Sequence, residues 1–236
     1  MAQPVVEIDK VGKIYYTGDV ETPVLFDLSF AIVPGEFVAI VGGSGSGKTT
    51  LLNLMGLLDR PTSGVIRVEG REVSNLDELG RARMRRDRLG FIFQFHYLLP
   101  EFTVLENALM PCRMRGREFE KSREARMREL LTCVGLEDKL NVRPPQLSGG
   151  QQQRVAVVRS LANDPAVVFA DEPTGNLDSA TGDRIGRLLF DLNAEAKTTL
   201  VLVTHERDLA ARCDRTIRID AGKVEADQAE AGRVVA

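Results

Sequence analysis

Residues 42–49 combine glycines, small hydroxyls and one lysine in a spacing that suits phosphate chemistry. The run reads Gly-Gly-Ser-Gly-Ser-Gly-Lys-Thr, with an apolar stretch at 37–41 before it and a helix-like stretch at 50–55 after it. Glycines leave backbone N–H groups free to wrap a phosphate, and the start of a helix attracts anions. Lys48 is expected to reach the β- and γ-phosphates, and the Thr49 hydroxyl to ligate Mg²⁺. The segment therefore predicts a nucleoside triphosphate site.

Two adjacent carboxylates, Asp171 and Glu172, follow a second apolar run at 167–170. In open α/β sheets the functional groups lie beyond the carboxyl ends of the strands, so both side chains are expected to face the phosphate site. Asp171 is expected to hold Mg²⁺, directly or through water. Glu172 is expected to orient and deprotonate the attacking water. The pair thus predicts hydrolysis as well as binding.

A second glycine-rich turn predicts a second anion-binding surface. It spans Leu147, Ser148, Gly149, Gly150 and Gln151, and Ser148 is a good N-cap for the helical stretch that follows. One triphosphate does not need two cradles within one chain. The second cradle either binds another ligand or completes a site on another copy of the chain.

The apolar pattern predicts the elements that position these groups. Expected strands are 5–8, 24–30, 37–41, 65–68, 90–93, 167–170, 199–203 and 216–219, and expected helices follow residue 50 and span 76–88 and 179–194. Met127, Leu130, Leu131 and Val134 recur at helical spacing and indicate core packing. These runs predict one α/β domain over 1–236, with a core and β part at 1–94 and 164–225, helices inserted at about 95–163, and a frayed tail at 226–236.

Composition excludes several classes of function. The formal net charge is −3, which leaves no overall attraction to nucleic acid or an anionic membrane. Five arginines at 81, 83, 85, 86 and 88 are interleaved with Asp87 and preceded by Asp77 and Glu78, which indicates a solvated helix face. No run approaches the roughly 20 apolar residues of a transmembrane helix, and the N-terminus does not resemble a signal peptide. We expect a soluble, cytoplasmic chain that meets a membrane only through partners.

Taken together, these motifs resemble the ATP-binding-cassette (ABC) ATPase family over nearly the whole chain. The resemblance implies a P-loop fold with a RecA-like core, an antiparallel β subdomain and an inserted α-helical subdomain. It is carried by the phosphate loop, a glutamine loop, a signature motif, the two carboxylates, a D-loop and a switch histidine. In this sequence these are Gly42, Gly43, Ser44, Gly45, Ser46, Gly47, Lys48, Thr49 and Thr50; Gln94; Leu147–Gln151; Asp171 and Glu172; Asn176, Leu177 and Asp178; and His205.

The family resemblance also implies roles and partners. Two copies pack head to tail, so Ser148 and Gly150 of one copy complete the site around the γ-phosphate bound by the other. Gln94 is implied to sense Mg²⁺ and the water, and His205 to contact the γ-phosphate. Tyr15 is the choice for the adenine platform, with adjacent Tyr16 as the alternative. His96 is expected to pack against a partner in an exposed loop and to take no part in catalysis.

Two segments resemble one subfamily in particular. Residues 89–103 and 171–178 are similar to the lipoprotein-releasing bacterial exporters, and more loosely to macrolide-export and cell-division relatives. That resemblance implies an ATPase dimer beneath two integral membrane subunits, on the cytoplasmic side of the inner membrane, with ATP and Mg²⁺. A DNA-repair ATPase would carry a long coiled coil between Gln94 and Leu147, and a ribosome-associated one would carry two cassettes. Neither feature is present in this sequence.

Overall fold

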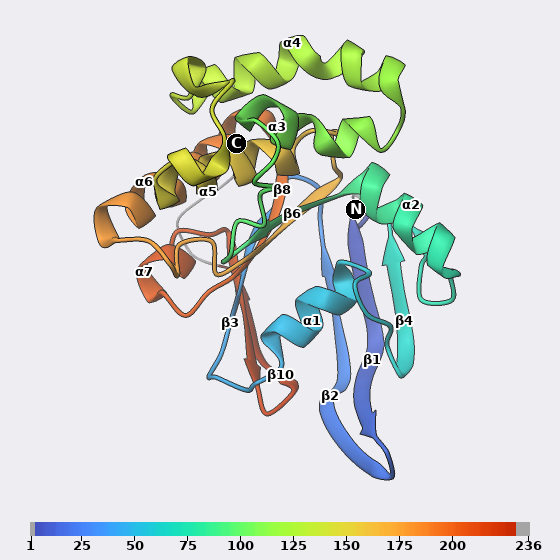
Figure 1. The fold of residues 1–236 in the computed structure, drawn as a ribbon. Helices are drawn as coiled ribbons and strands as arrows, with labels where there is room; N and C mark the ends of the chain where they lie inside the picture. Colours follow the sequence, from blue (N-terminus) through green and yellow to red (C-terminus); the bar gives the residue numbers. More distant parts are fainter. Residues whose placement is uncertain (1–2, 230–236) are drawn as a thin grey trace.

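The computed structural model describes residues 3–229, which form two β-sheets with helices between and around them (Figure 1). The first sheet is antiparallel, in the order β2-β1-β4-β5. Its strands are β1 (Val6–Thr17), β2 (Val20–Ile32), β4 (Ser63–Val68) and β5 (Arg71–Glu72). The first two are longer than the apolar runs at 5–8 and 24–30, because their distal ends pair with each other while mostly exposed.

The second sheet has the order β10-β9-β3-β8-β7-β6. Five strands run parallel and β10 pairs antiparallel with β9. Burial on both faces explains the continuous apolar runs of β3, β7 and β8. The carboxyl ends of the parallel strands meet at one edge, where the predicted functional loops emerge. The strands are β3 (Phe37–Val41), β6 (Leu89–Phe93), β7 (Val167–Asp171), β8 (Thr199–Val203), β9 (Arg215–Asp220) and β10 (Lys223–Ala229).

Helix α1 (Lys48–Met55) packs between the two sheets. Its buried residues Leu51 and Leu54 belong to one core cluster with Ile8 of β1 and Val201 of β8. Because α1 is covered on both sides, all of its apolar residues are buried although the helix is short. This packing also holds the phosphate loop, which leads directly into α1, against both sheets.

Three helices lie between β6 and β7 in the chain and gather at the top of Figure 1: α3 (Val104–Arg113), α4 (Arg117–Cys133) and α5 (Gly149–Ser160). They share a core that contains Met127, Leu131 and Val134, with Leu130 packed against it. The predicted helical stripe is therefore core, and the insertion of helices into an α/β domain is confirmed. The remaining elements are α2 (Glu78–Arg88), α6 (Ser179–Ala196), α7 (Arg207–Ala210) and the 3₁₀ turns Glu137–Lys139 and Pro144–Gln146.

The expected frayed tail at 226–236 is wrong for its first residues. Residues 226–229 belong to β10 and pair with residues 215–218 of β9. Arg215 also forms an ion pair with Asp227, at 2.5 Å between Nε and Oδ1. The segment looks polar in sequence because an exposed edge strand needs no apolar alternation. Residues 230–236 of the expected tail lie outside the described residues.

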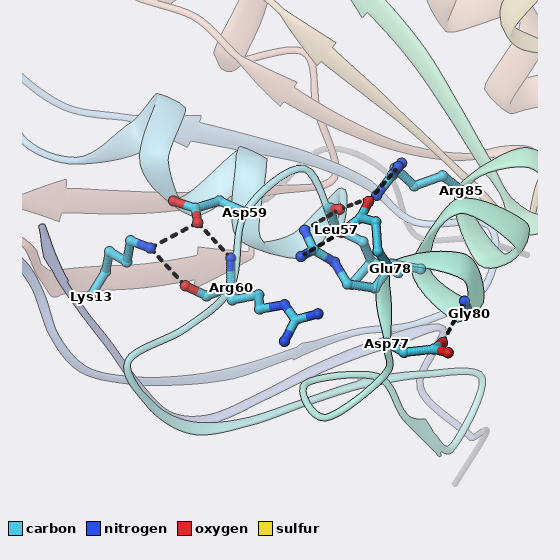
Figure 2. A network of polar contacts seen from close by, with 9 residues as sticks. Lys13, Leu57, Asp59, Arg60, Asp77, Glu78, Gly80 and Arg85 are labelled. Carbon is cyan, nitrogen blue, oxygen red and sulfur yellow. Dashed lines mark hydrogen bonds and ion pairs between the residues drawn. The ribbon is translucent and has the colours of Figure 1, made fainter.

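The arginine-rich helix is not simply the solvated face that its composition indicates. Arg81 is only 5% exposed. The guanidinium groups of Arg81 and Arg85 both donate to the backbone carbonyl of Leu57, at 2.6 and 2.7 Å. Figure 2 shows α2 beside the loop that follows α1, with Asp77 capping the helix at Gly80. The sequence does not indicate this role, because the acceptor is a backbone carbonyl, which every residue carries.

Candidate active site

The phosphate loop connects β3 to α1 and has a backbone that other residues could not adopt. A Cβ on Gly42 would lie 2.1 Å from the backbone oxygen of Ile219. Gly47 has a φ of 103°, and a Cβ there would lie 2.6 Å from Leu25 Cδ2. Lys48 Nζ donates to the carbonyl oxygens of Gly42 and Gly43, at 3.0 and 2.7 Å. The side chain of Lys48 thus folds back onto the start of its own loop.

The first turn of α1 leaves its N–H groups open to a ligand. Gly47 occupies the N-cap position without a side-chain cap, and no acidic residue lies in the first turn. The Ser46 hydroxyl is buried without a hydrogen-bond partner. Uncapped N–H groups at a helix N-terminus carry partial positive charge and attract phosphate. The geometry can therefore hold an anion at residues 42–49.

Asp171 and Glu172 lie at the same sheet edge as this loop, at the end of β7. Asp171 Oδ1 is buried without a hydrogen-bond partner. Burial first, and then the neighbouring Glu172, raise the pKa of the Asp171 carboxyl, while Lys48 acts in the opposite direction. A buried carboxylate with a vacant acceptor fits a cation, and Mg²⁺ commonly takes only one or two protein carboxylates alongside phosphate oxygens. Asp171 and Thr49 therefore fit the predicted Mg²⁺ site, although no cluster of three or more acidic, His or Cys ligands exists within residues 3–229.

Glu172 and His205 are brought together from two neighbouring strands. Glu172 follows β7 with a φ of 46°, and its N–H donates to the carbonyl of Val203 at the end of β8. His205 Nδ1 lies 2.8 Å from Glu172 Oε2, with the histidine side chain 70% exposed and the glutamate 19%. This close contact with the Glu172 carboxylate, and then the negative charge of Glu172, raise the pKa of His205. Two predicted catalytic residues thus contact each other.

Gln94 also lies at this edge, directly after β6, but its side chain pairs with the D-loop. Gln94 Nε2 donates to Asn176 Oδ1, and Asn176 Nδ2 donates back to the Gln94 carbonyl, each at 3.1 Å. Asp178 caps α6 by accepting from the N–H of Thr181 at 3.0 Å. The structural role of Asn176 was not foreseen, and its position after Gly175 in a polar turn was the available signal.

The signature turn begins α5 and is capped from within. Ser148 Oγ accepts from the N–H of Gln151 at 3.3 Å, and Gln151 Oε1 accepts from the N–H of Ser148 at 2.9 Å. A Cβ on Gly150 would lie 2.3 Å from Thr181 Cγ2, so α6 packs closely behind the turn. Figure 1 shows α5 among the upper helices, apart from α1 between the sheets. One chain does not bring its two glycine cradles together.

Tyr15 and Tyr16 differ in their surroundings. Tyr15 is 38% exposed and its hydroxyl donates to Asp59 Oδ2 at 2.9 Å, whereas Tyr16 is 60% exposed. Lys13 Nζ lies 4.6 Å from the centroid of the Tyr15 ring. Tyr15 therefore contacts the loop after α1, and its role as adenine platform stays a prediction. The contribution of Lys13 and Asp59 was missed, because nothing in the spacing of residues 13 and 59 links them.

His96 has a more internal role than the sequence indicates. It is half-buried, and its Nδ1 lies 2.5 Å from Oε1 of Gln153, a fully buried residue of α5. Arg159, also on α5, donates to the carbonyls of His96 and Tyr97, both at 2.7 Å. The loop after Gln94 is thus fastened to α5. Packing of this loop against a partner stays a prediction.

A cavity of about 420 Å³ opens beside the same loop. Apolar side chains of Leu58, Tyr97 and Met114 line it together with Arg85 and Arg86. The first three are 43%, 64% and 66% exposed, which is unusual for large apolar residues that share one hollow. The cavity lies between α2, β6 and the helical insert. No helix within residues 3–229 is long and apolar enough to cross a membrane.

Comparisons with known proteins show which family this chain resembles. The ABC transporter family model matches residues 25–175. The chain is 50% identical to the lipoprotein-releasing system ATP-binding protein LolD of Anaeromyxobacter dehalogenans, over 96% of this chain and 95% of that protein. It is 44% identical to LolD 1 of Caulobacter vibrioides, over 97% of both chains, and 47% identical to LolD of Xanthomonas campestris, over 93% and 92%.

Solved structures show the same fold. The dimeric post-hydrolysis state of the ATP-binding cassette MJ0796, bound to ADP and Pi, superimposes with a TM-score of 0.85 at 39% identity. A second dimeric structure of MJ0796, described as a bacterial ABC transporter cassette, has a TM-score of 0.85 at 41% identity. Each alignment covers 97% of this chain and all of the other. The predicted fold class is confirmed.

Proposed function

Because the chain belongs to the ABC transporter family, we propose that it is the ATP-hydrolysing subunit of a bacterial transporter that releases lipoproteins from the inner membrane. The observation that carries the proposal is the edge at which the phosphate loop, Asp171, Glu172 and His205 meet. The LolD names of relatives with up to 50% identity support lipoprotein release over macrolide export or cell division. We therefore take lipoprotein release as the function to test.

Binding of ATP would use groups that are open in this structure. The N–H groups of the loop and the first turn of α1 receive the phosphates, and Lys48 turns from its own carbonyls to the β- and γ-phosphates. Thr49 and Asp171 would hold Mg²⁺, with Gln94 as a further neighbour. When bound, the ion neutralises charge on the phosphate oxygens. Tyr15 receives the adenine.

Hydrolysis would then follow from the contact between Glu172 and His205. The γ-phosphate offers His205 another anionic partner, which frees the Glu172 carboxylate to accept a proton from water. The water oxygen attacks the γ-phosphorus, and the bond to the bridging oxygen breaks to release ADP. General-base catalysis of this kind contributes about 10²–10⁴ in rate. Glu172 is therefore the residue whose loss should stop turnover.

The active centre would be completed by a second copy of the chain. Helix α5, which begins at the signature turn, lies apart from α1, which begins at the phosphate loop, and the cassettes similar in structure are dimers. In a head-to-tail dimer, the signature turn of each copy would contact the γ-phosphate held by the other. ATP then favours the closed dimer because both copies contact it, and hydrolysis removes that shared ligand. The cycle of closing and opening supplies the mechanical step.

Two integral membrane subunits would receive this motion on the cytoplasmic side of the inner membrane. The cavity beside Tyr97 and Met114 supports a docking place for them, together with the apolar loop at 98–102. It adjoins the loop after Gln94, which leads from the nucleotide site into the helical insert. The chain itself would touch the membrane only through these partners, and its balanced charge favours no nucleic acid.

Reconstitution tests the proposal directly. The chain is assembled in proteoliposomes with candidate integral membrane subunits and a fluorescent lipoprotein, and ATP is added with a soluble lipoprotein carrier. We expect ATP-dependent transfer of the lipoprotein to the carrier, and none with Glu172→Gln. A complex that hydrolyses ATP but transfers a macrolide and no lipoprotein would contradict lipoprotein release. Recovery of the chain with ribosomes or DNA, and no membrane protein, would contradict transport.

A further inference from the structure

The hydroxyl end of Tyr15 is fastened to the loop that follows α1. Tyr15 Oη donates to Asp59 Oδ2 at 2.9 Å. The other carboxylate oxygen of Asp59 accepts from Lys13 Nζ at 2.8 Å and from the N–H of Arg60 at 2.7 Å, as Figure 2 shows. The same Lys13 ammonium lies 4.6 Å from the centre of the Tyr15 ring. Asp59 and Lys13 thus hold Tyr15 at its hydroxyl and against one side of its ring.

The loop that carries Asp59 is itself held from two directions. From β1, Lys13 Nζ also donates to the carbonyl of Arg60 at 2.8 Å. From α2, Arg81 and Arg85 donate to the carbonyl of Leu57. Figure 2 shows Lys13 on one side of the loop and Arg85 on the other. Asp59 is therefore held in place in the loop that follows the carboxyl end of α1.

Tyr15 depends on its contact with Asp59 for a fixed position, because the end of the β1–β2 hairpin that carries it is exposed. Residues 15–17 of β1 and 20–23 of β2 are exposed and pair through the backbone. A hairpin end with few buried contacts is free to move locally. The hydrogen bond to Asp59 ties the ring to the body of the protein across 44 positions of the chain.

The charges strengthen this tie. Burial opposes ionisation of Asp59, but hydrogen bonds from Lys13, Arg60 and Tyr15 outweigh it and hold the pKa of Asp59 below its ordinary value. Burial, and then the bond to Asp59, raise the pKa of the Tyr15 hydroxyl. At neutral pH a protonated phenol thus donates to an ionised carboxylate, and such charge-assisted bonds are about twice as strong as neutral ones.

The geometry points to Asp59 as a positioning residue, which holds the Tyr15 ring in the orientation that receives the nucleotide base. This inference rests on the proposed function, in which Tyr15 stacks on adenine. Stacking of a base on an aromatic ring changes affinity from about 5-fold to about 150-fold. Holding the ring in advance removes the cost of ordering it when the nucleotide binds. Replacing Asp59 should therefore weaken binding of the base and leave binding of the phosphates unchanged.

Binding of the base and binding of the phosphates are distinguished by measuring the affinities for ADP and for pyrophosphate, both with Mg²⁺. Neither compound carries a γ-phosphate, so hydrolysis and ATP-driven dimer closure do not enter. Each is titrated in competition with a fluorescent ADP against the wild type, Asp59→Asn, Tyr15→Phe, the double variant and Tyr15→Ala. Asp19→Asn, in the exposed turn between β1 and β2, is the matched control.

We expect Tyr15→Ala to lower the affinity for ADP by about 10-fold and Asp59→Asn to lower it by about 5-fold. The affinity for pyrophosphate should be unchanged in both variants. Tyr15→Phe keeps the ring and loses its donor, so it should match Asp59→Asn, and the double variant should add nothing further. Equal weakening of ADP and pyrophosphate by Asp59→Asn would overturn the inference in favour of a general structural role. The inference would also be overturned if Tyr15→Ala lowered the affinity for ADP while Asp59→Asn left it unchanged. A wild-type chain that binds neither ligand would instead contradict the proposed nucleotide site.

Discussion

The two glycine-rich turns of this chain both begin a helix, yet they are built in opposite ways. The turn before α1 has no side-chain cap, and it buries an unpaired hydroxyl at Ser46. The turn before α5 is capped by Ser148 and Gln151, which satisfy each other's backbone N–H groups. A turn without side-chain caps leaves its N–H groups to water or a ligand, whereas the caps of the second turn already satisfy two of its N–H groups. The first is suited to hold a phosphate and the second to present a rigid surface to one held elsewhere.

The largest expected effect comes from replacing Glu172, the carboxylate that acts on the ATP held by the first turn. We expect Glu172→Gln to lower the rate of ATP hydrolysis by about 10²–10⁴-fold, because the amide cannot accept a proton from water. ATP binding should persist, and ATP-bound dimers should accumulate on size-exclusion chromatography. Glu195→Gln, exposed on α6, is the matched control and should hydrolyse ATP normally. Normal turnover by Glu172→Gln would exclude Glu172 as the base.

Mixing two inactive variants tests whether the turns serve different chains. Lys48→Ala disables the first turn and Ser148→Arg the second, so each variant alone should lose most of its ATPase activity. A head-to-tail heterodimer of the two contains one site in which both turns are intact. Part of the activity should therefore return on mixing, in proportion to heterodimer formed. A mixture that stays as inactive as its components would contradict a shared site.

Loss of a cap should affect the two helices differently in the absence of nucleotide. Ser148→Ala removes the oxygen that accepts from the N–H of Gln151, so we expect the free energy of unfolding to fall by about 1 kcal/mol. Ser44→Ala, in the exposed part of the first turn, removes no cap and should leave that free energy unchanged. Urea unfolding of both variants provides the measurement. An equal loss in both would show that the first turn is stabilised by its own side chains after all.

The smallest effect concerns the histidine beside the first turn. The contact with Glu172 raises the pKa of His205, so an NMR titration should place it above that of an ordinary histidine and Glu172→Gln should lower it. The folded-state pKa is the higher one, so stabilisation by the pair is fully present below the unfolded pKa. It is lost as pH rises through the folded pKa. A His205 titration unaffected by Glu172→Gln would contradict the contact.

Local chemistry made much of this site predictable. The phosphate loop, the carboxylates after β7 and the cap at Ser148 each depend on residues within a few positions of one another. Their types alone therefore predict the structure. The strands β3, β7 and β8 were equally evident, because burial on both faces leaves continuous apolar runs. The same reasoning failed for β10, an edge strand in which only Val224 packs against a core cluster, and for Arg81, whose partner is a backbone carbonyl.

The residue types thus determined by themselves which segments could bind phosphate, hold a cation and begin a helix, since those properties belong to short stretches of chain. Tertiary structure alone decided which distant groups meet. Packing of strands in the order β3-β8-β7-β6 places His205 against Glu172 and Gln94 against Asn176, and folding of the loop after α1 carries Asp59 to Tyr15. Such contacts depend on the relative positions of elements far apart in the chain, for which local spacing contains no signal.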